Sequence, residues 1–166
     1  HRDLHSFPTR RSSDLLYFVG DTKNQSYTAK LQNKIYKLNL NNNCKILGNL
    51  SRNDLKIFYH LSTVVASFPL QEEGFGRIVS ESLIMNKKIL AFNYGGVKDQ
   101  LENLDDIYKV NTHQYENIVL KLKNIIQLDK EQFSNISTFS RDYIIKSFSK
   151  SQMVKNYFNL YEQESI

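Results

Sequence analysis

Cysteine and proline are scarce in this 166-residue sequence, and long apolar runs are absent. The single cysteine, Cys44, cannot form a disulfide within the chain, which favours a reducing compartment. It stands beside an apolar stretch, where we expect a buried and inert thiol. No apolar run approaches the roughly 20 residues that a membrane-spanning helix needs. We therefore expect a cytoplasmic protein, soluble or peripheral, and contact with the inner face of a membrane stays open.

The composition also gives little support to zinc or nucleic-acid binding. Outside the first fifteen residues the only histidines are His60 and His113, and without a second cysteine they make no zinc ligand set. The net charge is +5, and it is +4 for residues 16–166 because the first fifteen residues carry three arginines and two aspartates. This surplus suits an anionic ligand or an anionic membrane surface, but it is too small and scattered to predict a nucleic-acid partner.

The first fifteen residues, HRDLHSFPTRRSSDL, show no helical or strand periodicity. They look like the translation of a sequencing adaptor fused to a genuine reading frame, and we interpret residues 1–15 as a non-native tail. A disordered natural N-terminus is the alternative. Residues 16–166 have the length and apolar content of one globular domain.

Short apolar runs alternate with amphipathic stretches from residue 16 to about residue 127. Such alternation predicts an α/β fold, in which a Rossmann-like parallel sheet has helices on both faces. Ligands bind such sheets at the carboxyl ends of the strands. The predicted strands are 16–20, which we expect to be buried, 45–48, 63–67, 88–92 and 107–110. The loops at their carboxyl ends begin at Gly20, Gly48, Phe68 and Asn93.

The longest of these loops contains the stretch EEGFGRIVSESL, residues 72–83. If a helix begins near Arg77, its first turn offers unpaired N–H groups and a positive dipole end, which together suit an anion. Gly74 and Gly76 let this backbone approach a ligand closely. Glu73 lies in the loop on one side, and Glu81 lies one turn into the helix on the other. This order matches a nucleotide sugar, with its hydroxylated sugar, diphosphate and ribose diol.

Structural explanations of the same residues stay open at this point. Glu81 could pair with Arg77 four residues earlier on a solvated helix face, and Glu73 could belong to an exposed acidic turn. The Gly-Phe-Gly stretch is not a dinucleotide-binding fingerprint, because Val79 stands where that pattern needs a third glycine.

From Leu16 onward the sequence resembles the C-terminal, donor-binding domain of retaining glycosyltransferases of family 4, which have the two-domain GT-B fold. The resemblance lies in the stretches LLYFVGD, CKILGNL, STVVASFPLQEEGFGRIVSESLIMNKKILAFNYGGVKDQL and FSKSQMVKNYFNLYEQ. The third stretch carries the family's pair of glutamates, with seven residues between them, as Glu73 and Glu81, and then Gly95-Gly96.

The resemblance implies a role for each matching residue. Glu73 is expected at the donor sugar near the reaction centre, and Glu81 at the ribose. The family needs no metal, so Asp105-Asp106 is expected to be a turn. The remaining implied contacts are Gly74, Phe75 and Gly76 at the sugar, Arg77 and Ile78 at the diphosphate, and Gly48, Asn49 and Leu50 at the base.

Three departures from the family pattern accompany the resemblance. The family's Arg and Lys that clamp the diphosphate precede LLYFVG, where the tail now stands. Asp99 occupies the place of a family glutamate, and the N-terminal acceptor domain is missing. We therefore expect a fragment that binds donor poorly and is inactive alone.

The parent protein is expected to be a hexosyltransferase-type enzyme that moves a sugar, with retention, from a nucleoside-diphosphate sugar to a surface glycan or lipid-linked acceptor. GFGRIVSES and abundant Asn, Lys and Ile hint at a bacterial polysaccharide enzyme. The alternatives are a non-catalytic nucleotide-sugar-binding module and a GT-B-fold nucleotide-sugar isomerase.

Overall fold

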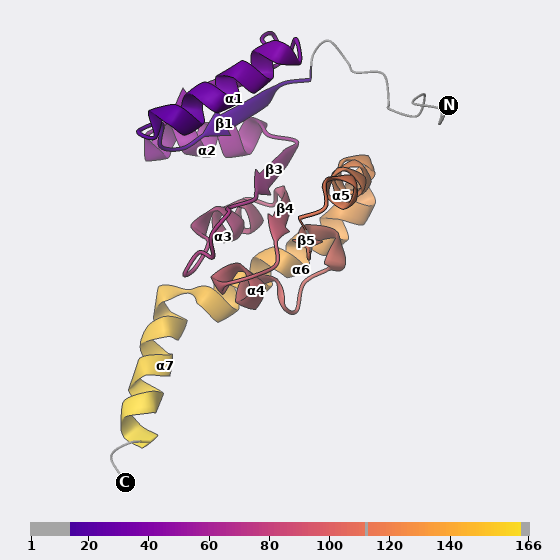
Figure 1. The fold of residues 1–166 in the computed structure, drawn as a ribbon. Coiled ribbons are helices and arrows are strands. Elements are labelled where there is room, and N and C mark those ends of the chain that lie inside the picture. Colours follow the sequence, from indigo (N-terminus) through magenta and orange to yellow (C-terminus); the bar gives the residue numbers. More distant parts are fainter. Residues whose placement is uncertain (1–13, 112, 164–166) are drawn as a thin grey trace. The chain divides into compact units, whose positions relative to one another are not determined.

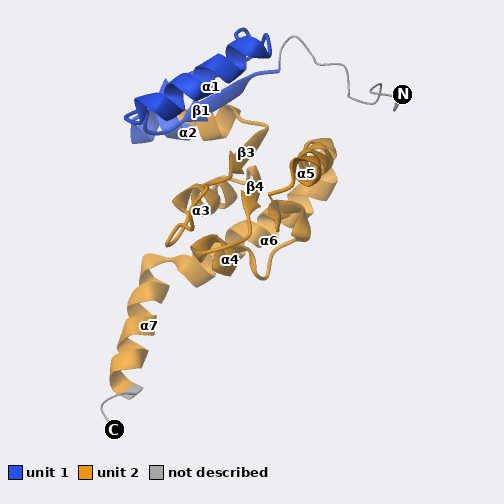
Figure 2. Ribbon diagram, in the orientation of Figure 1, with its two compact units in different colours: residues 1–56 blue, residues 57–166 orange. Residues whose placement is uncertain are grey.

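The computed structural model of the chain describes residues 14–111 and 113–163 (Figure 1). Most of the predicted non-native tail, residues 1–15, lies outside the described residues, and its origin stays a prediction. The chain forms two compact units, His1–Lys56 and Ile57–Ile166 (Figure 2).

The first unit contains a strand-helix-strand motif. Its strands β1 (Leu16–Val19) and β2 (Cys44–Gly48) pair in parallel, and α1 (Gln25–Lys37) connects them. α1 begins where the Asn24 side chain accepts a hydrogen bond of 3.0 Å from the N–H of Tyr27. An N-cap of this kind satisfies one of the N–H groups that a helix start leaves unpaired.

The prediction of a buried first strand is wrong. In β1, Leu16, Tyr17 and Val19 are 51%, 41% and 39% exposed. Parallel strands are buried when helices cover both faces of a sheet, whereas among the described residues β1 belongs to a sheet of only two strands. In contrast, the predicted burial of the Cys44 side chain is confirmed.

The second unit is built on a three-stranded parallel sheet in the order β3-β4-β5. α2 begins in the first unit and ends in the second. The remaining elements are α2 (Arg52–Leu61), β3 (Val64–Ser67), α3 (Arg77–Ile84), β4 (Lys88–Phe92), α4 (Gly96–Leu101), η1 (Asp106–Tyr108), β5 (Lys109–Val110), α5 (Tyr115–Gln127), α6 (Lys130–Phe148) and α7 (Lys150–Gln163).

β4 is the central strand of this sheet and is buried on both faces. Ile89 and Ala91 belong to a core cluster with side chains of α3, α4 and α6, whereas Leu90 and Phe92 pack with side chains of α5. The alternation follows from the two-residue period of a strand. The predicted α/β fold class, with parallel strands and helices on both faces, is therefore confirmed. The strands nevertheless form two sheets, and within the described residues no strand of one pairs with a strand of the other.

α6, with 19 residues, is the longest helix of the described part. It was not predicted from the sequence as a separate helix. Its buried residues are Ser137, Ser140 and Ile144, so its inner face carries little of the apolar signal that marks a helix. Both serine hydroxyls donate to carbonyl groups of the same helix, which allows them to be buried.

Ile144 offers a direct test of the core of the second unit. The Ile144 side chain is 2% exposed, whereas its neighbour Ile145 is 44% exposed. We expect Ile144→Ala to lower the free energy of unfolding by about 2–5 kcal/mol because it leaves a cavity. Ile145→Ala is the matched control and is expected to cost about 0.5 kcal/mol. Urea denaturation followed by circular dichroism measures both, and equal losses would contradict the packing described.

Candidate functional site

The start of α3 is open to a ligand. The helix begins at Arg77, as predicted, and Gly76 precedes it in a left-handed conformation with φ 73° that favours glycine. No side chain caps this start, and the first turn contains no acidic residue. Among the described residues, the N–H groups of Arg77 and Ile78 have no acceptor. These unpaired donors and the helix dipole suit an anionic group.

The loop before α3 rests directly on the backbone of the double glycine. The N–H of Gly96 donates to the carbonyl of Glu73 at 2.9 Å. A Cβ atom on Gly96 would lie 2.1 Å from the carbonyl oxygen of Gly74, and one on Gly95 would lie 2.9 Å from that of Glu73. Because neither position has room for a side chain, glycine at both is what allows the loop to pack here.

Gln100 of α4 holds the same loop from the other end. Its side chain is fully buried, and its Nε2 atom donates to the carbonyl of Phe75. The carbonyls of Gly76 and Gly96 lie 3.5 Å from the same nitrogen. The residues that precede α3 are thus tied to α4 at two points, the Gly96 amide and the Gln100 side chain.

The Glu73 carboxylate lies beside the start of α3. Its Oε2 atom is 3.5 Å from the position that a Cβ atom of Gly76 would occupy. The residue is half-buried and, within residues 14–111 and 113–163, its carboxylate makes no ion pair. An unpaired carboxylate in this place can accept hydrogen bonds from the hydroxyl groups of a ligand.

Glu81 is held by a buried tyrosine. The hydroxyl of Tyr59 donates to Glu81 Oε2 at 3.0 Å, and Tyr59 is 5% exposed. Burial, then the hydrogen bond to Glu81 and its negative charge, raises the pKa of Tyr59 well above its ordinary value. Tyr59 therefore stays a hydrogen-bond donor at neutral pH. In the described part of the chain no ion pair joins Glu81 to Arg77, so that alternative is not what the structure shows.

Within the second unit, the structure brings the predicted contacts of the sugar, the diphosphate and the ribose to the start of α3. Phe75 and Ile78 are 41% and 38% exposed there. Gly48, Asn49 and Leu50 lie in the first unit, where the Gly48 carbonyl at the end of β2 accepts from the N–H of Gly20 at 3.0 Å. The residues at or beside the start of α3 are Glu73, Gly74, Phe75, Gly76, Arg77, Ile78 and Glu81.

Tyr59 and Gln100 are not among the site residues predicted from the sequence. Both are polar side chains on the buried face of a helix, where a hydrogen-bond partner is required. For Gln100 the sequence contains a signal of burial. Val97 lies three residues before it and Leu101 directly after it, and both apolar side chains mark this face of α4 as buried. A glutamine in an apolar stripe of this kind indicates a specific acceptor nearby.

The family of the chain follows from a match to a protein-family model. Residues 4–141 match the model described as glycosyl transferases group 1. The chain belongs to this family. The match begins within the predicted non-native tail and covers the whole loop and helix described above. A search of curated proteins finds no match.

Several solved glycosyltransferase structures have the same fold as this group 1 domain. A glycosyltransferase from Rickettsia africae ESF-5 has a TM-score of 0.79 and 26% identity, over 90% of this chain and 40% of that one. Anabaena Alr3699/HepE, solved in complex with UDP and glucose, has a TM-score of 0.74 and 21% identity, over 92% of this chain and 41% of that one. A second structure of Alr3699/HepE contains UDP-glucose. The chain spans about 40% of the length of the proteins that it matches.

The Asp105-Asp106 pair of the glycosyltransferase domain, predicted to be a turn, instead lies at the start of η1, with Asp105 as its N-cap and Asp106 as its first residue. Asp105 accepts a hydrogen bond of 2.8 Å from the N–H of Ile107, and Asp106 lies 3.3 Å from the Lys109 ammonium. Among the described residues, no group of three or more His, Cys, Asp or Glu side chains is placed to hold a metal ion. Nor does any described helix combine the length and the apolar character needed to cross a membrane.

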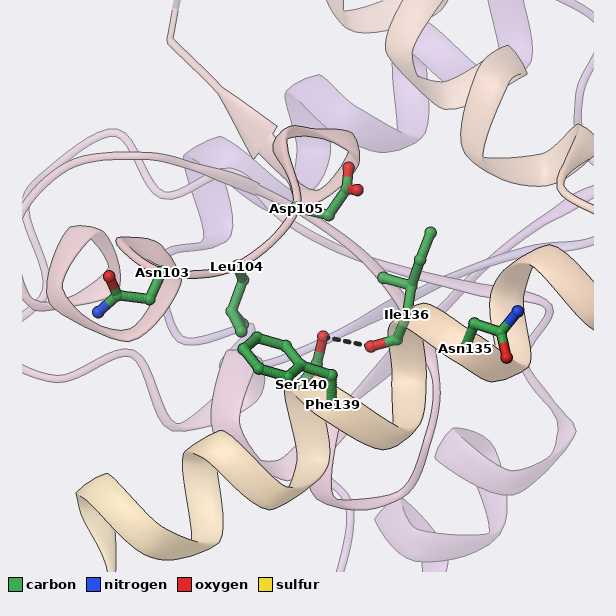
Figure 3. A pocket seen from close by; sticks show the side chains of 7 residues that line it. All are labelled: Asn103, Leu104, Asp105, Asn135, Ile136, Phe139 and Ser140. Carbon is green, nitrogen blue, oxygen red and sulfur yellow. Dashed lines mark hydrogen bonds between the residues drawn. The ribbon is translucent and has the colours of Figure 1, made fainter.

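A separate hollow lies between the loop before η1 and α6 and has a volume of about 500 Å³ (Figure 3). This size is in the range of ligand pockets. Three of its polar side chains are already engaged: Asn103 donates to the Tyr143 hydroxyl, Asp105 caps η1, and Ser140 donates to the carbonyl of Ile136 at 2.8 Å. None of the predicted site residues lines it, so we do not assign it a function. Its lining residues are Asn103, Leu104, Asp105, Asn135, Ile136, Phe139 and Ser140.

The contact between the loop and the double glycine predicts that alanine substitutions at two glycines differ sharply in their effect on stability. We expect Gly96→Ala to destabilise the second unit by about 1–3 kcal/mol because the new methyl group overlaps the carbonyl of Gly74. Gly74→Ala is the control, since nothing lies within 4 Å of its added Cβ atom. Thermal unfolding measures both, and a fully stable Gly96→Ala variant would contradict this packing.

Proposed function

We propose that this chain is the donor-binding half of a retaining, family 4 glycosyltransferase that moves a sugar from a nucleoside-diphosphate sugar to a surface glycan or lipid-linked acceptor. The observation that carries the proposal is that the uncapped start of α3 lies beside the Glu73 carboxylate. Glu81, in the same helix α3, accepts a hydrogen bond from Tyr59 of α2. UDP and UDP-glucose in the Anabaena structures support it, because those proteins share the fold.

Each part of the donor has a proposed partner. The N–H groups of Arg77 and Ile78 donate to the diphosphate, and the Glu81 carboxylate accepts from the ribose hydroxyls. The backbone of residues 74–76 lines the sugar, whose hydroxyls donate to Glu73. The residues proposed to contact the base are Gly48, Asn49 and Leu50.

The chemistry follows from where negative charge develops. As the bond between the sugar and the diphosphate breaks, charge grows on the departing phosphate oxygen. Fixed N–H groups and the α3 dipole aimed at this oxygen stabilise the transition state more than the ground state. The acceptor hydroxyl then bonds to the same sugar carbon from the same face, and its proton passes to the departing phosphate. The step needs no metal ion.

The proposal also covers the rest of the protein. The acceptor half of the cleft comes from an N-terminal domain, and the enzyme works in the cytoplasm at the inner face of the membrane. We expect the native upstream reading frame to encode a second Rossmann-like domain, followed by an Arg and a Lys shortly before LLYFVG. An upstream frame without such a domain would contradict the GT-B part of the proposal.

The function itself is tested on the full-length protein. We expect isothermal titration calorimetry with a panel of nucleoside diphosphates to reveal one that binds, and the matching sugar donor to support transfer. A protein that binds a nucleoside diphosphate but transfers no sugar to any acceptor would be a binding module. Failure to bind any nucleoside diphosphate would overturn the donor-site proposal.

Glu81→Ala is expected to weaken nucleotide binding. The variant removes a charged acceptor from the ribose hydroxyls, so the dissociation constant of the nucleoside diphosphate rises roughly 10- to 100-fold. Glu102→Ala serves as the control, because Glu102 is an exposed glutamate at the end of α4. Calorimetry measures both variants, and an unchanged Glu81→Ala would show that Glu81 does not contact the ribose.

Glu73→Ala is expected to act mainly on transfer. The carboxylate contacts the sugar near the reaction centre, so kcat falls roughly 100-fold, as for the loss of one contact made in the transition state. Affinity for the nucleoside diphosphate, which lacks the sugar, changes less than about twofold. Initial rates and calorimetry separate the two effects. Normal kcat in this variant would remove Glu73 from the reaction centre.

A further inference from the structure

Gln100 is a polar side chain in an apolar setting. It lies on α4 beside Val97 and Leu101, and all three are at most 2% exposed. Its Oε1 atom is buried and has no hydrogen-bond partner among the described residues. A buried oxygen without a donor lowers stability, so this glutamine is poorly suited to a purely structural role.

The unpaired oxygen follows from what the amide nitrogen does. Among the described residues, the acceptors around Nε2 are the backbone carbonyls of Phe75, Gly76 and Gly96. Turning the amide around would place Oε1 against these carbonyl oxygens, which repel it. The nitrogen must therefore face the loop, and the oxygen is left in the apolar interior.

The hydrogen bond to Phe75 also sets the direction of a backbone N–H group. In a trans peptide unit the C=O and the following N–H point in opposite directions. Because the Phe75 carbonyl points toward Gln100, the N–H of Gly76 points away from it. Gly76 is buried, yet its N–H has no acceptor in the described part of the chain. Buried N–H groups are nearly always paired, so this one calls for an acceptor from outside the chain.

We propose that Gln100 is a positioning residue, which holds the peptide unit between Phe75 and Gly76 so that the Gly76 N–H donates to the sugar-side phosphate of the donor. This rests on the proposed function. Glu73 marks the sugar side of the site and Glu81 the ribose side, and Gly76 stands next to the Glu73 carboxylate. The phosphate nearest to this N–H is therefore the one that carries the sugar.

The two phosphates of the donor give a selective experiment. In the full-length protein, Gln100→Leu keeps the side-chain volume but removes the nitrogen that holds the Phe75 carbonyl. We expect the dissociation constant of the nucleoside diphosphate to rise about tenfold, as for the loss of one oriented hydrogen bond to a charged group. The nucleoside monophosphate with the same base lacks the second phosphate, and its affinity is expected to change less than twofold.

Stability provides a second readout. Gln100→Leu removes the unpaired oxygen but also leaves the Phe75 carbonyl without its donor, so we expect the melting temperature to fall by only a few degrees. Leu101→Ala is the matched control, since the next residue of α4 is fully buried but contributes only apolar packing. It is expected to lower the melting temperature and to leave the ratio of diphosphate to monophosphate affinity unchanged.

The possible outcomes separate this inference from the function on which it rests. Gln100→Met repeats the test with a flexible side chain of similar size, in case leucine does not fit. Equal losses for both nucleotides, or no loss for either, in the folded variants would show that Gln100 does not position a phosphate-binding amide. If these variants bind normally while Glu81→Ala binds weakly, the donor site stands and the inference is wrong. If the unaltered protein binds no nucleotide, both are wrong.

Discussion

The candidate site depends on one contact between two pieces of backbone. The loop before α3 packs on the double glycine at the start of α4. There the Gly96 N–H donates to the Glu73 carbonyl. A Cβ atom on Gly95 or Gly96 would lie too close to the loop. Since the contact is made by main-chain atoms, it fixes the path of the loop more tightly than long side chains would. The position of the Glu73 carboxylate and the start of α3 at Arg77 both follow from that path.

Buried side chains then set the direction of the groups that the loop presents. Tyr59 donates to Glu81 from α2, and Gln100 donates to Phe75 from α4. Both donors are fixed by packing before any ligand arrives, so the charged and polar groups need little rearrangement on binding. Preorganisation of this kind is what allows dipoles and hydrogen bonds to stabilise developing charge efficiently. The geometry thus suits the binding of an anionic group at the start of α3.

The sequence predicted the elements of the site better than the way they are held. Glycines, apolar runs and the start of a helix at Arg77 leave local signals, and the structure has the helix where these signals placed it. The contacts of Tyr59 and Gln100 join residues 22 and 25 positions apart, and no local pattern encodes such pairs. The burial of β1 was predicted wrongly because burial depends on which elements cover a strand, and the sequence of the strand alone does not show this. The apolar runs of β1 and β4 look alike, but only β4 has helices on both faces.

The unpaired groups of the second unit point to the same place. Among the described residues, two buried side-chain atoms lack a hydrogen-bond partner, Asn93 Oδ1 and Gln100 Oε1, and they flank the double glycine on either side in sequence. The unpaired N–H groups at the start of α3 lie across the same loop contact. Native proteins rarely leave such groups unsatisfied, and exceptions concentrate where binding or catalysis requires them. The two oxygens lack donors and the N–H groups lack acceptors, so a ligand that accepts hydrogen bonds would satisfy only the N–H groups at the start of α3.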